Sequence, residues 1–266
     1  MSIASLSREA WQSRDFIFAS VKREFVARYQ GTQLGIFWPI AHPLALIVIY
    51  TLVFSQMMRP RLAGHQGYFA YSIYLTAGIV TWNLFSDLLT RAVSVFVSHG
   101  NVMKKVSIPH IVFPVIATAS ATVQFLILFS IFLVFLVATG NFPGWAILAT
   151  LPVIAVLVLL AIGLGILLGT VNVFYRDVEQ STGIVLQFWF WLTPVVYPSD
   201  ILPPLVKSIL SWNPLWPIVV GMQGIYVDGQ VPDWETLAYP AIVAVALITL
   251  ARAAFNGLAH ELVDEL

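Results

Sequence analysis

The chain has 266 residues, of which 59% are hydrophobic and only 10% are charged, and its mean hydropathy is +0.87. A soluble domain typically carries about 25% charged residues, so this composition excludes an ordinary soluble protein and predicts an integral membrane protein. The formal net charge is zero, and the absence of cysteine excludes disulfides, thiolate metal sites and thiol nucleophiles. With five scattered histidines as the only imidazoles, no metal site is expected.

Residues 1–35 are expected to form an amphipathic helix along the cytoplasmic membrane surface. Apolar side chains recur there at helical spacing, at Trp11, Phe18, Val21, Phe25 and Tyr29. Arg14 and Lys22 fall near the same face, so their stems must extend toward water. Charged residues interrupt the segment, which excludes a secretory signal. The helix either anchors the topology or moves as part of a membrane machine.

Six apolar stretches predict membrane-spanning helices, since crossing the hydrocarbon core takes about 20 apolar residues. They cover residues 36–58, 68–89, 111–138, 145–173, 183–196 and 237–255. The fifth stretch is short and ends near Pro194 and Pro198. All six are too evenly apolar for barrel strands, so the expected fold class is an all-α integral membrane protein. We predict one domain over 1–266, with a six-span bundle over 36–255 and a cytoplasmic tail over 256–266.

The positions of the basic residues predict the orientation. With six spans, both termini share one side of the membrane with the loops at 90–110 and 174–182. Ten of the 13 basic residues fall on that side: Arg8, Arg14, Lys22, Arg23, Arg28, Arg91, Lys104, Lys105, Arg176 and Arg252. The other side holds Arg59, Arg61 and Lys207. Because basic residues concentrate in cytoplasmic loops, both termini are expected in the cytoplasm.

The first of these loops, at 90–110, is longer than a simple turn needs. Its apolar stretch Val93–Val97 precedes Gly100, and this order predicts a short helix that ends at Gly100 and faces a cytoplasmic partner. A plain basic loop that fixes the topology is the alternative. In the compact second turn, Arg176 and Asp177 pair locally or contact the same partner.

Residues 197–235 contain six prolines among apolar runs. These runs are too short to cross a membrane and too apolar for solvated loops. Short re-entrant helices between the fifth and sixth spans are therefore expected, packed against protein or lining a water-filled path. Their functional interpretation is a lid over an exit.

The motifs of common enzymes are missing from the sequence. It has no G-x-x-x-x-G-K-[ST] loop for nucleotide phosphates, no H-E-x-x-H and no G-x-S-x-G. His42 is the one ionisable group well inside a predicted span, and a structural role is expected for it rather than catalysis. No catalytic residue is therefore predicted. Without charged residues at mid-membrane, the energy for any transport must come from elsewhere.

Four segments of the sequence follow one another in a recognisable order. They are "VKREFVARYQGTQLGIFWPIAHPL", "NVMKKVSIPHIVFPV", "NVFYRDVEQSTGIVLQFWFWLTPVVYP" and "SWNPLWPIVV". Together they resemble the signature regions of ABC-2 type permeases that export polysaccharides, in particular the Wzm-like permeases of O-antigen exporters and their teichoic-acid relatives. The resemblance runs nearly the whole length of the chain.

The resemblance implies a homodimer in the bacterial inner membrane, bound to two copies of a separate ABC ATPase subunit. ATP and magnesium are then expected in that partner, and no cofactor or nucleic acid is expected on this chain. The implied substrate is a polysaccharide attached to an undecaprenyl-diphosphate-type lipid. The polysaccharide passes through a continuous channel, and membrane lipids surround the protein. An ABC-2 exporter of a drug or small lipid, or an enzyme that modifies envelope polysaccharide, are the alternatives.

The resemblance also assigns roles to residues. The loop helix near Val93–Val106 corresponds to the element seated on the ATPase, and the implied coupling residues are Val97, Asn101, Lys104, Lys105, Arg176 and Asp177. Residues 199–230 correspond to the periplasmic gate helices, and the implied gate residues are Pro194, Pro198, Asn213 and Pro214.

The stretch "QFWFWLTPVVYP" at 187–198 is unusually rich in rings. A sugar ring has an apolar C–H face that can slide along aromatic faces, so these rings are expected to line the channel. A helix cannot point all of them one way, which favours Phe190 and Trp191. The other expected lining residues are Trp38, Tyr50, Trp82, Phe85 and Tyr197. The alternative is that each ring serves an interfacial belt or ordinary packing.

Overall fold

The structure is a computed structural model. Every regular secondary-structure element in its described part is a helix. The described residues are 11–29, 37, 41, 44–45, 47–49, 69–105, 109 and 111–265. The expected all-α fold class is thereby confirmed. Most of the predicted first span lies outside the described residues, and so do Trp38, His42 and Tyr50.

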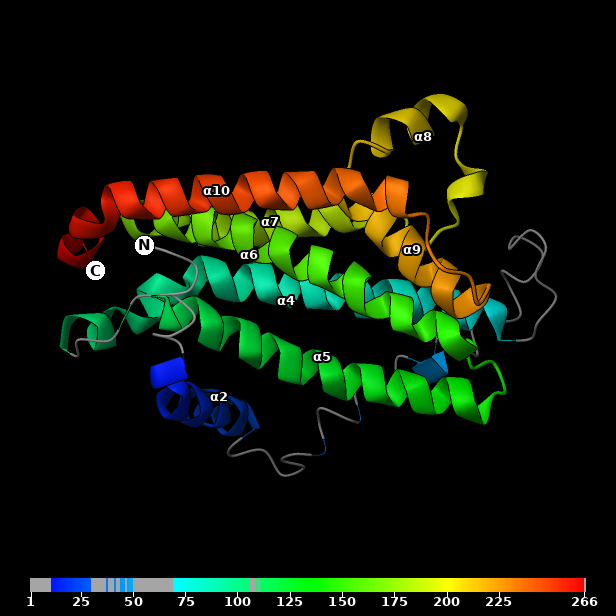
Figure 1. The fold of residues 1–266 in the computed structure, drawn as a ribbon, viewed down its shortest axis with the longest axis horizontal. Helices are drawn as coiled ribbons and strands as arrows, with labels where there is room; N and C mark the ends of the chain where they lie inside the picture. The colour runs from blue at the N-terminus through cyan, green and yellow to red at the C-terminus, as the bar shows by residue number, and fades with distance from the viewer. Residues whose placement is uncertain are drawn as a thin grey trace.

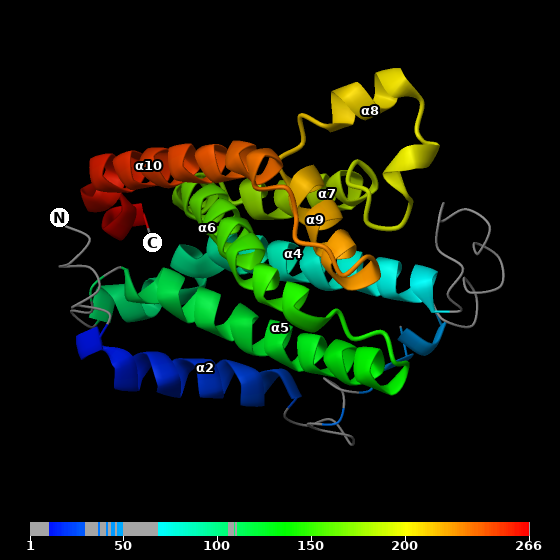
Figure 2. The same ribbon diagram turned by 45° about the vertical axis from the view of Figure 1, so that its right-hand side comes forward.

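Four long helices form the bundle and lie side by side in Figures 1 and 2. They are α4 (Ala70–Lys105), α5 (Val112–Ala138), α6 (Thr150–Phe174) and α10 (Trp234–Glu265). One end of the bundle carries the turn between α6 and α7 (Asp177–Trp191), together with the C-terminal end of α10. We call this the α6–α7 end. The opposite end, which carries α8 (Pro204–Leu210), is the α8 end.

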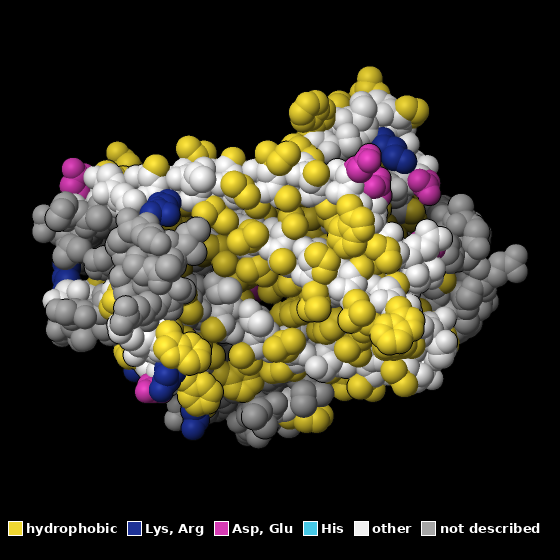
Figure 3. All heavy atoms as spheres, viewed as in Figure 1, with side chains coloured by type: hydrophobic (Ala, Val, Ile, Leu, Met, Phe, Trp, Pro, Cys, Tyr) yellow, Lys and Arg dark blue, Asp and Glu magenta, His cyan; other side chains and the backbone are white. Residues whose placement is uncertain are grey.

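Among the described residues, three helices have both the length and the apolar composition to cross a membrane. They are Val112–Ala138, Gly144–Phe174, which begins as the 3₁₀ helix η3 (Gly144–Ala149), and Trp234–Leu258. They match the third, fourth and sixth predicted spans, and the chain is a multi-pass membrane protein. Figure 3 shows hydrophobic side chains over the visible faces of α5, α6 and α10, with most of the visible charged side chains toward the two ends. The last helix continues to Glu265, through most of the predicted tail at 256–266.

The predicted second span and the loop that follows it form one helix. α4 has 36 residues, about 54 Å at 1.5 Å per residue, and it passes through Gly100 without ending there. The prediction of a loop at 90–110 is therefore wrong for residues 90–105, which are helical. Apolar side chains of this stretch, including Val95 and Phe96, are buried against α5 and α6, and this packing sustains one continuous helix where a separate short helix ending at Gly100 was expected.

The helix at the predicted fifth span, 183–196, begins and ends earlier than expected. α7 has 15 residues, ends at Trp191, and leads into a turn that includes Pro194 and Pro198. This length, about 22 Å at 1.5 Å per residue, falls short of a full crossing. Proline has no backbone N–H and cannot continue the helix.

Glycines bring α6 directly against α4. A Cβ atom on Gly165 would lie 2.4 Å from the Cβ of Ala92, and one on Gly169 would lie 2.6 Å from the backbone oxygen of Ala92. Such distances leave no room for a side chain, so both positions require glycine. Small residues four apart allow close approach of helix backbones, which is a common device in membrane bundles.

The N-terminal helix α2 (Arg14–Tyr29) packs lengthwise beside α5 in both ribbon views. Trp11 and Phe18 are 68% and 73% exposed and point away from the bundle, while Ser20 is buried. Polar and apolar side chains share the side of α2 that faces the bundle. The polar partners that the bundle offers to this side are described below. The placement of this segment along the membrane surface stays a prediction.

Short helices occupy the region predicted to be re-entrant. They are the 3₁₀ helix η4 (Ser199–Ile201), α8 and α9 (Leu215–Val227). Apolar residues of α9, among them Ile218 and Met222, are buried in the main core. α8 instead protrudes from the bundle, as Figures 1 and 3 show.

Candidate functional site

The turn at 192–198 is held by side chains from two other helices. The Tyr71 hydroxyl of α4 donates to the Val196 oxygen at 2.7 Å, and the Tyr74 hydroxyl donates to the Tyr197 oxygen at 2.9 Å. From α9, Gln223 Nε2 donates to the oxygen of Pro194 at 3.0 Å. These bonds satisfy carbonyls that a broken helix leaves without partners. The turn is therefore fastened to α4 and α9.

Asn213 joins the same turn to the start of α9. Its Oδ1 accepts hydrogen bonds from the indole nitrogen of Trp189 at 2.9 Å and from the backbone N–H of Leu215 at 3.0 Å. Its Nδ2 donates to Thr193 Oγ1 at 2.8 Å and to the oxygen of Leu192 at 3.2 Å. One side chain thus connects the end of α7, the turn and α9.

The aromatic rings divide into a packed group and an exposed group. Phe85 is fully buried, with its ring centroid 5.3 Å from that of Trp189, and Trp82 packs edge-on against Phe190 at 5.4 Å. The prediction that Phe85 lines a channel is wrong, because neighbouring side chains of the same chain cover its ring. Trp82 is also buried and serves mainly as packing.

Trp191 and Tyr197 keep accessible surface at the end of α7. Trp191 is 64% exposed, and Phe190 and Tyr197 are half-buried. The Tyr197 hydroxyl donates to the Trp191 oxygen at 2.8 Å. Burial raises the pKa of Tyr197 above its ordinary value, so this hydroxyl stays protonated and able to donate near neutral pH. A path along this face would be lined by Trp191, Phe190 and Tyr197.

The four predicted gate residues all lie at this turn or next to it. Pro194 is buried within the turn, and Pro198 ends it. Pro214 precedes the first residue of α9, where a proline costs no helical hydrogen bond. With the network of Asn213, the structure brings the predicted gate residues together.

The predicted coupling residues lie on two elements. Arg176 and Asp177 are exposed in the turn between α6 and α7. Val97 is half-buried on α4, and Lys104 is exposed in its last turn. Asn101 and Lys105 belong to the same helix, and their side chains are outside the described part of the structure.

Asn172 was missed by the sequence analysis. It is fully buried, its Nδ2 donates to the Val93 oxygen at 3.2 Å, and its Oδ1 accepts the backbone N–H of Glu179 at 3.0 Å. This amide therefore ties α4 and α6 to the first turn of α7. Gln223 was missed as well. Both are single polar residues in strongly apolar helices, and that pattern is the signal that could have identified them.

No metal-binding cluster occurs in the described ranges, where no group of three or more histidine, aspartate and glutamate side chains converges. The hydrogen bonds at the turn join neutral groups and backbone carbonyls. Such an arrangement can position a chain segment and bind by contact, but it supplies no nucleophile or acid–base pair.

The sequence matches the ABC-2 type transporter family over residues 16–227. It is 25% identical to the O-antigen export system permease protein RfbA of Klebsiella pneumoniae. The alignment covers 251 residues, or 94% of each chain. The protein of the same name from Myxococcus xanthus is 27% identical over 263 residues, or 98% of this chain and 99% of the relative. The polysialic acid transport protein KpsM of Escherichia coli is 19% identical over 235 residues, or 88% and 90%. Because the family match extends over most of its length, the chain belongs to the ABC-2 type transporter family.

Proposed function

We propose that this chain is the permease subunit of an ATP-driven exporter that moves lipid-linked polysaccharide, O-antigen in particular, from cytoplasm to periplasm. The observation that carries the proposal is the likeness to O-antigen export permeases over at least 94% of this chain and of each relative. A likeness of that extent indicates a shared architecture rather than one shared motif. The weaker likeness to polysialic acid transport proteins supports polysaccharide as the substrate class. The lipid carrier is of the undecaprenyl-diphosphate type.

The proposed assembly is a homodimer of this chain with two ATPase subunits in the bacterial inner membrane. ATP and Mg²⁺ bind to the ATPase, in keeping with the missing phosphate-binding loop of this chain. Exposed Arg176 and Asp177, together with Lys104, offer charged side chains to that partner. In this proposal the α6–α7 end and both termini lie in the cytoplasm, which the excess of basic residues supports.

In the proposed path, the sugar chain passes the exposed rings at the end of α7. Replacing Trp191 with alanine is expected to reduce surface polysaccharide severalfold, because the indole supplies a broad apolar contact for sugar faces. Since 64% of this side chain is exposed, thermal stability of the purified protein should stay unchanged. Trp145, which is 88% exposed at the start of η3, provides the matched control. Equal export by W191A and W145A would contradict a lining role.

Deleting the gene tests the proposed function directly. Lipid-linked polysaccharide should accumulate inside the cell, where a membrane-impermeant label cannot reach it. The wild-type gene should restore labelling at the surface, and only when the partner ATPase is intact. Normal surface polysaccharide in the deletion strain would contradict the proposal. Polysaccharide that reaches the surface with altered decoration would instead favour an envelope-modifying enzyme.

A further inference from the structure

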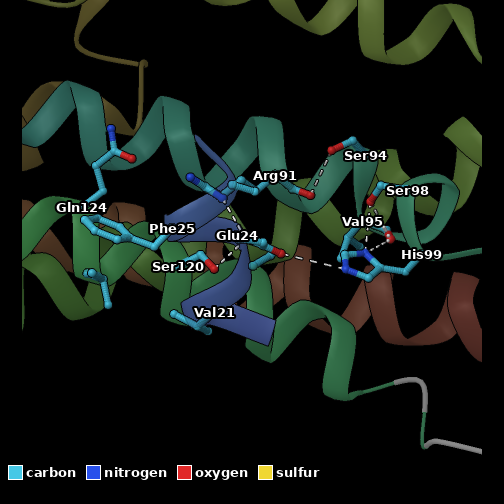
Figure 4. A pocket seen from close by; sticks show the side chains of 13 residues that line it. Val21, Glu24, Phe25, Arg91, Ser94, Val95, Ser98, His99, Ser120 and Gln124 are labelled. Carbon is cyan, nitrogen blue, oxygen red and sulfur yellow. Dashed lines mark hydrogen bonds and ion pairs between the residues drawn. The ribbon is translucent and has the colours of Figure 1, made fainter. Parts of the chain in front are cut away.

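A cavity of about 500 Å³ lies between α2 and the bundle (Figure 4). Val21, Glu24 and Phe25 line it from α2, and the opposite wall comes from α4 and α5. The polar groups of that wall are Arg91, Ser94, Ser98, His99, Ser120 and Gln124. The contact between α2 and the rest of the protein therefore contains a space lined by both polar and apolar side chains.

Glu24 makes the charged contacts across this cavity. Its Oε2 accepts hydrogen bonds from Arg91 Nη1 at 3.2 Å and from Ser120 Oγ at 2.7 Å. Its Oε1 lies 3.9 Å from His99 Nε2. Figure 4 shows these groups converging on Glu24 from two helices. A single carboxylate thus links α2 to both α4 and α5.

Both polar and apolar side chains of α2 face the bundle. Ser20 is buried, and Glu24 is half-buried together with Ile17, Val21 and Phe25, whereas Phe18 points away and is 73% exposed. The half-buried apolar side chains contribute to docking. Glu24 adds the hydrogen bonds to Arg91 of α4 and Ser120 of α5, so we expect the docked position of α2 to depend on it.

Arg91 and His99 keep other contacts when α2 moves away, while the Ser120 hydroxyl loses its bond to Glu24. Arg91 Nε donates to Asp87 Oδ2 at 2.9 Å within α4, so its charge stays compensated without Glu24. His99 keeps Nδ1 within 3.0 Å of the Val95 oxygen. Undocking therefore leaves no uncompensated charge in the bundle, and water hydrates the carboxylate of Glu24. The large penalty of breaking a buried ion pair, which arises from an orphaned charge, does not apply here.

We propose that Glu24 is a positioning residue that holds α2 on the bundle as a releasable latch, and that α2 undocks and redocks during each export cycle. The first claim, that Glu24 docks α2, depends only on the contacts of Glu24; we call it the docking half. The second claim, that α2 undocks in each cycle, rests on the proposed function because it requires turnover with the ATPase partner; we call it the cycling half.

The docking half is tested by distance measurements between spin labels on α2 and α5. The chain has no cysteine, so Ala19→Cys and Leu126→Cys place labels at two exposed positions without further changes. The labelled chain is diluted with unlabelled chain in the intact transporter, so that a dimer carries one labelled copy. Glu24→Arg should abolish the docked distance, and Glu24→Gln should reduce its population. The charge swap Glu24→Arg with Arg91→Glu should restore it.

Asp15→Asn is the matched control, because Asp15 is an acidic residue of the same helix whose side chain is 96% exposed. It should leave the docked distance unchanged. A Glu24→Arg variant that keeps the wild-type distance would overturn the latch, and so would a charge swap that fails to restore docking in a folded transporter. A role of Glu24 in folding alone would not produce rescue by the swap.

Movement of α2 during export is tested by fixing it in place with Val21→Cys and Ala117→Cys, which line the same cavity from α2 and α5. A bifunctional thiol reagent with a reducible bond should join the two cysteines and stop export, and a reductant should restore it. Undiminished export with the cross-link formed would overturn cycling and leave docking intact. If even the cysteine-free chain exports no polysaccharide, the proposed function fails, while the spin-label distances still report on the latch.

Discussion

Replacing Asn213 with alanine is expected to abolish most polysaccharide export and to lower the thermal stability of the purified protein. The substitution removes four hydrogen bonds, which join Trp189, Leu192, Thr193 and Leu215 through one amide. With a net value of about 1 kcal/mol each and partial replacement by water, the loss in unfolding free energy is about 2–4 kcal/mol. The turn at 192–198 should then lose its fixed position relative to α9.

The control for this experiment is Asn141→Ala. Asn141 is exposed near the same end of the bundle, and its Nδ2 donates only to the nearby oxygen of Thr139, at 2.9 Å. Export and melting temperature should both stay near wild type in this variant. Measurement of surface polysaccharide beside melting curves in detergent separates loss of the gate from loss of the protein. If N213A exports as well as N141A, the Asn213 network has no part in transport.

Replacing Gly169 with alanine should have the largest effect on the bundle itself. The new Cβ would lie 2.6 Å from the oxygen of Ala92 and 3.2 Å from that of Val93. Both are backbone atoms of α4 and cannot turn aside, so the two helices must separate. Overpacking of this kind costs about 1–3 kcal/mol, and the loss of close packing between α4 and α6 adds to it. We expect a lower melting temperature and reduced protein levels in the membrane.

Gly183→Ala is the matched control for this substitution. Gly183 also lies inside a helix, but nothing comes within 4 Å of the position of its added Cβ. Alanine favours the helix over glycine by about 1 kcal/mol, so G183A should be neutral or slightly more stable than wild type. If G169A and G183A had the same melting temperature, α4 and α6 would not need their close approach.

The apolar spans were the most predictable part of the fold. Three of them, including 111–138, carry a strong and uninterrupted hydrophobic signal, and their helices begin within a few residues of the expected positions, although the last one continues beyond its predicted end to Glu265. The continuation of α4 to Lys105 was not predictable in the same way. Its second half mixes polar and charged residues with apolar ones, and only contacts with other helices show that Val95 and Phe96 belong to a core.

The placement of α2 shows the limit of periodicity arguments. The helical spacing of apolar residues grouped Trp11 and Phe18 with Val21 and Phe25 on one face, but Trp11 and Phe18 point away from the bundle while Val21 and Phe25 are half-buried. Glu24 faces inward because Arg91 and Ser120 accommodate it, and these partners lie 67 and 96 residues further along the chain. A sequence shows charged residues but not which distant partner each will meet.

The candidate site was predicted in part. Proline positions and the Asn213-Pro214 pair indicated the turn and its neighbour, since proline restricts the backbone wherever it occurs. The roles of the rings were less accessible, because Phe85 and Trp191 are equally aromatic and differ only in what covers them. Tyr71, Tyr74 and Gln223 escaped notice because the groups they bind are backbone carbonyls, which every residue has.

The continuity of α4 has a mechanical consequence. The hydroxyl of Tyr74, near one end, holds the turn at 192–198, while the exposed Lys104 lies in the last turn at the other end. Thirty residues of uninterrupted helix separate them, a span of about 45 Å. A continuous helix of this length passes a tilt at one end on to the other end. A tilt of α4 at its Lys104 end displaces the tyrosine hydroxyls at its other end, so the turn can be loosened from the opposite end of the bundle without a chain of intermediate rearrangements.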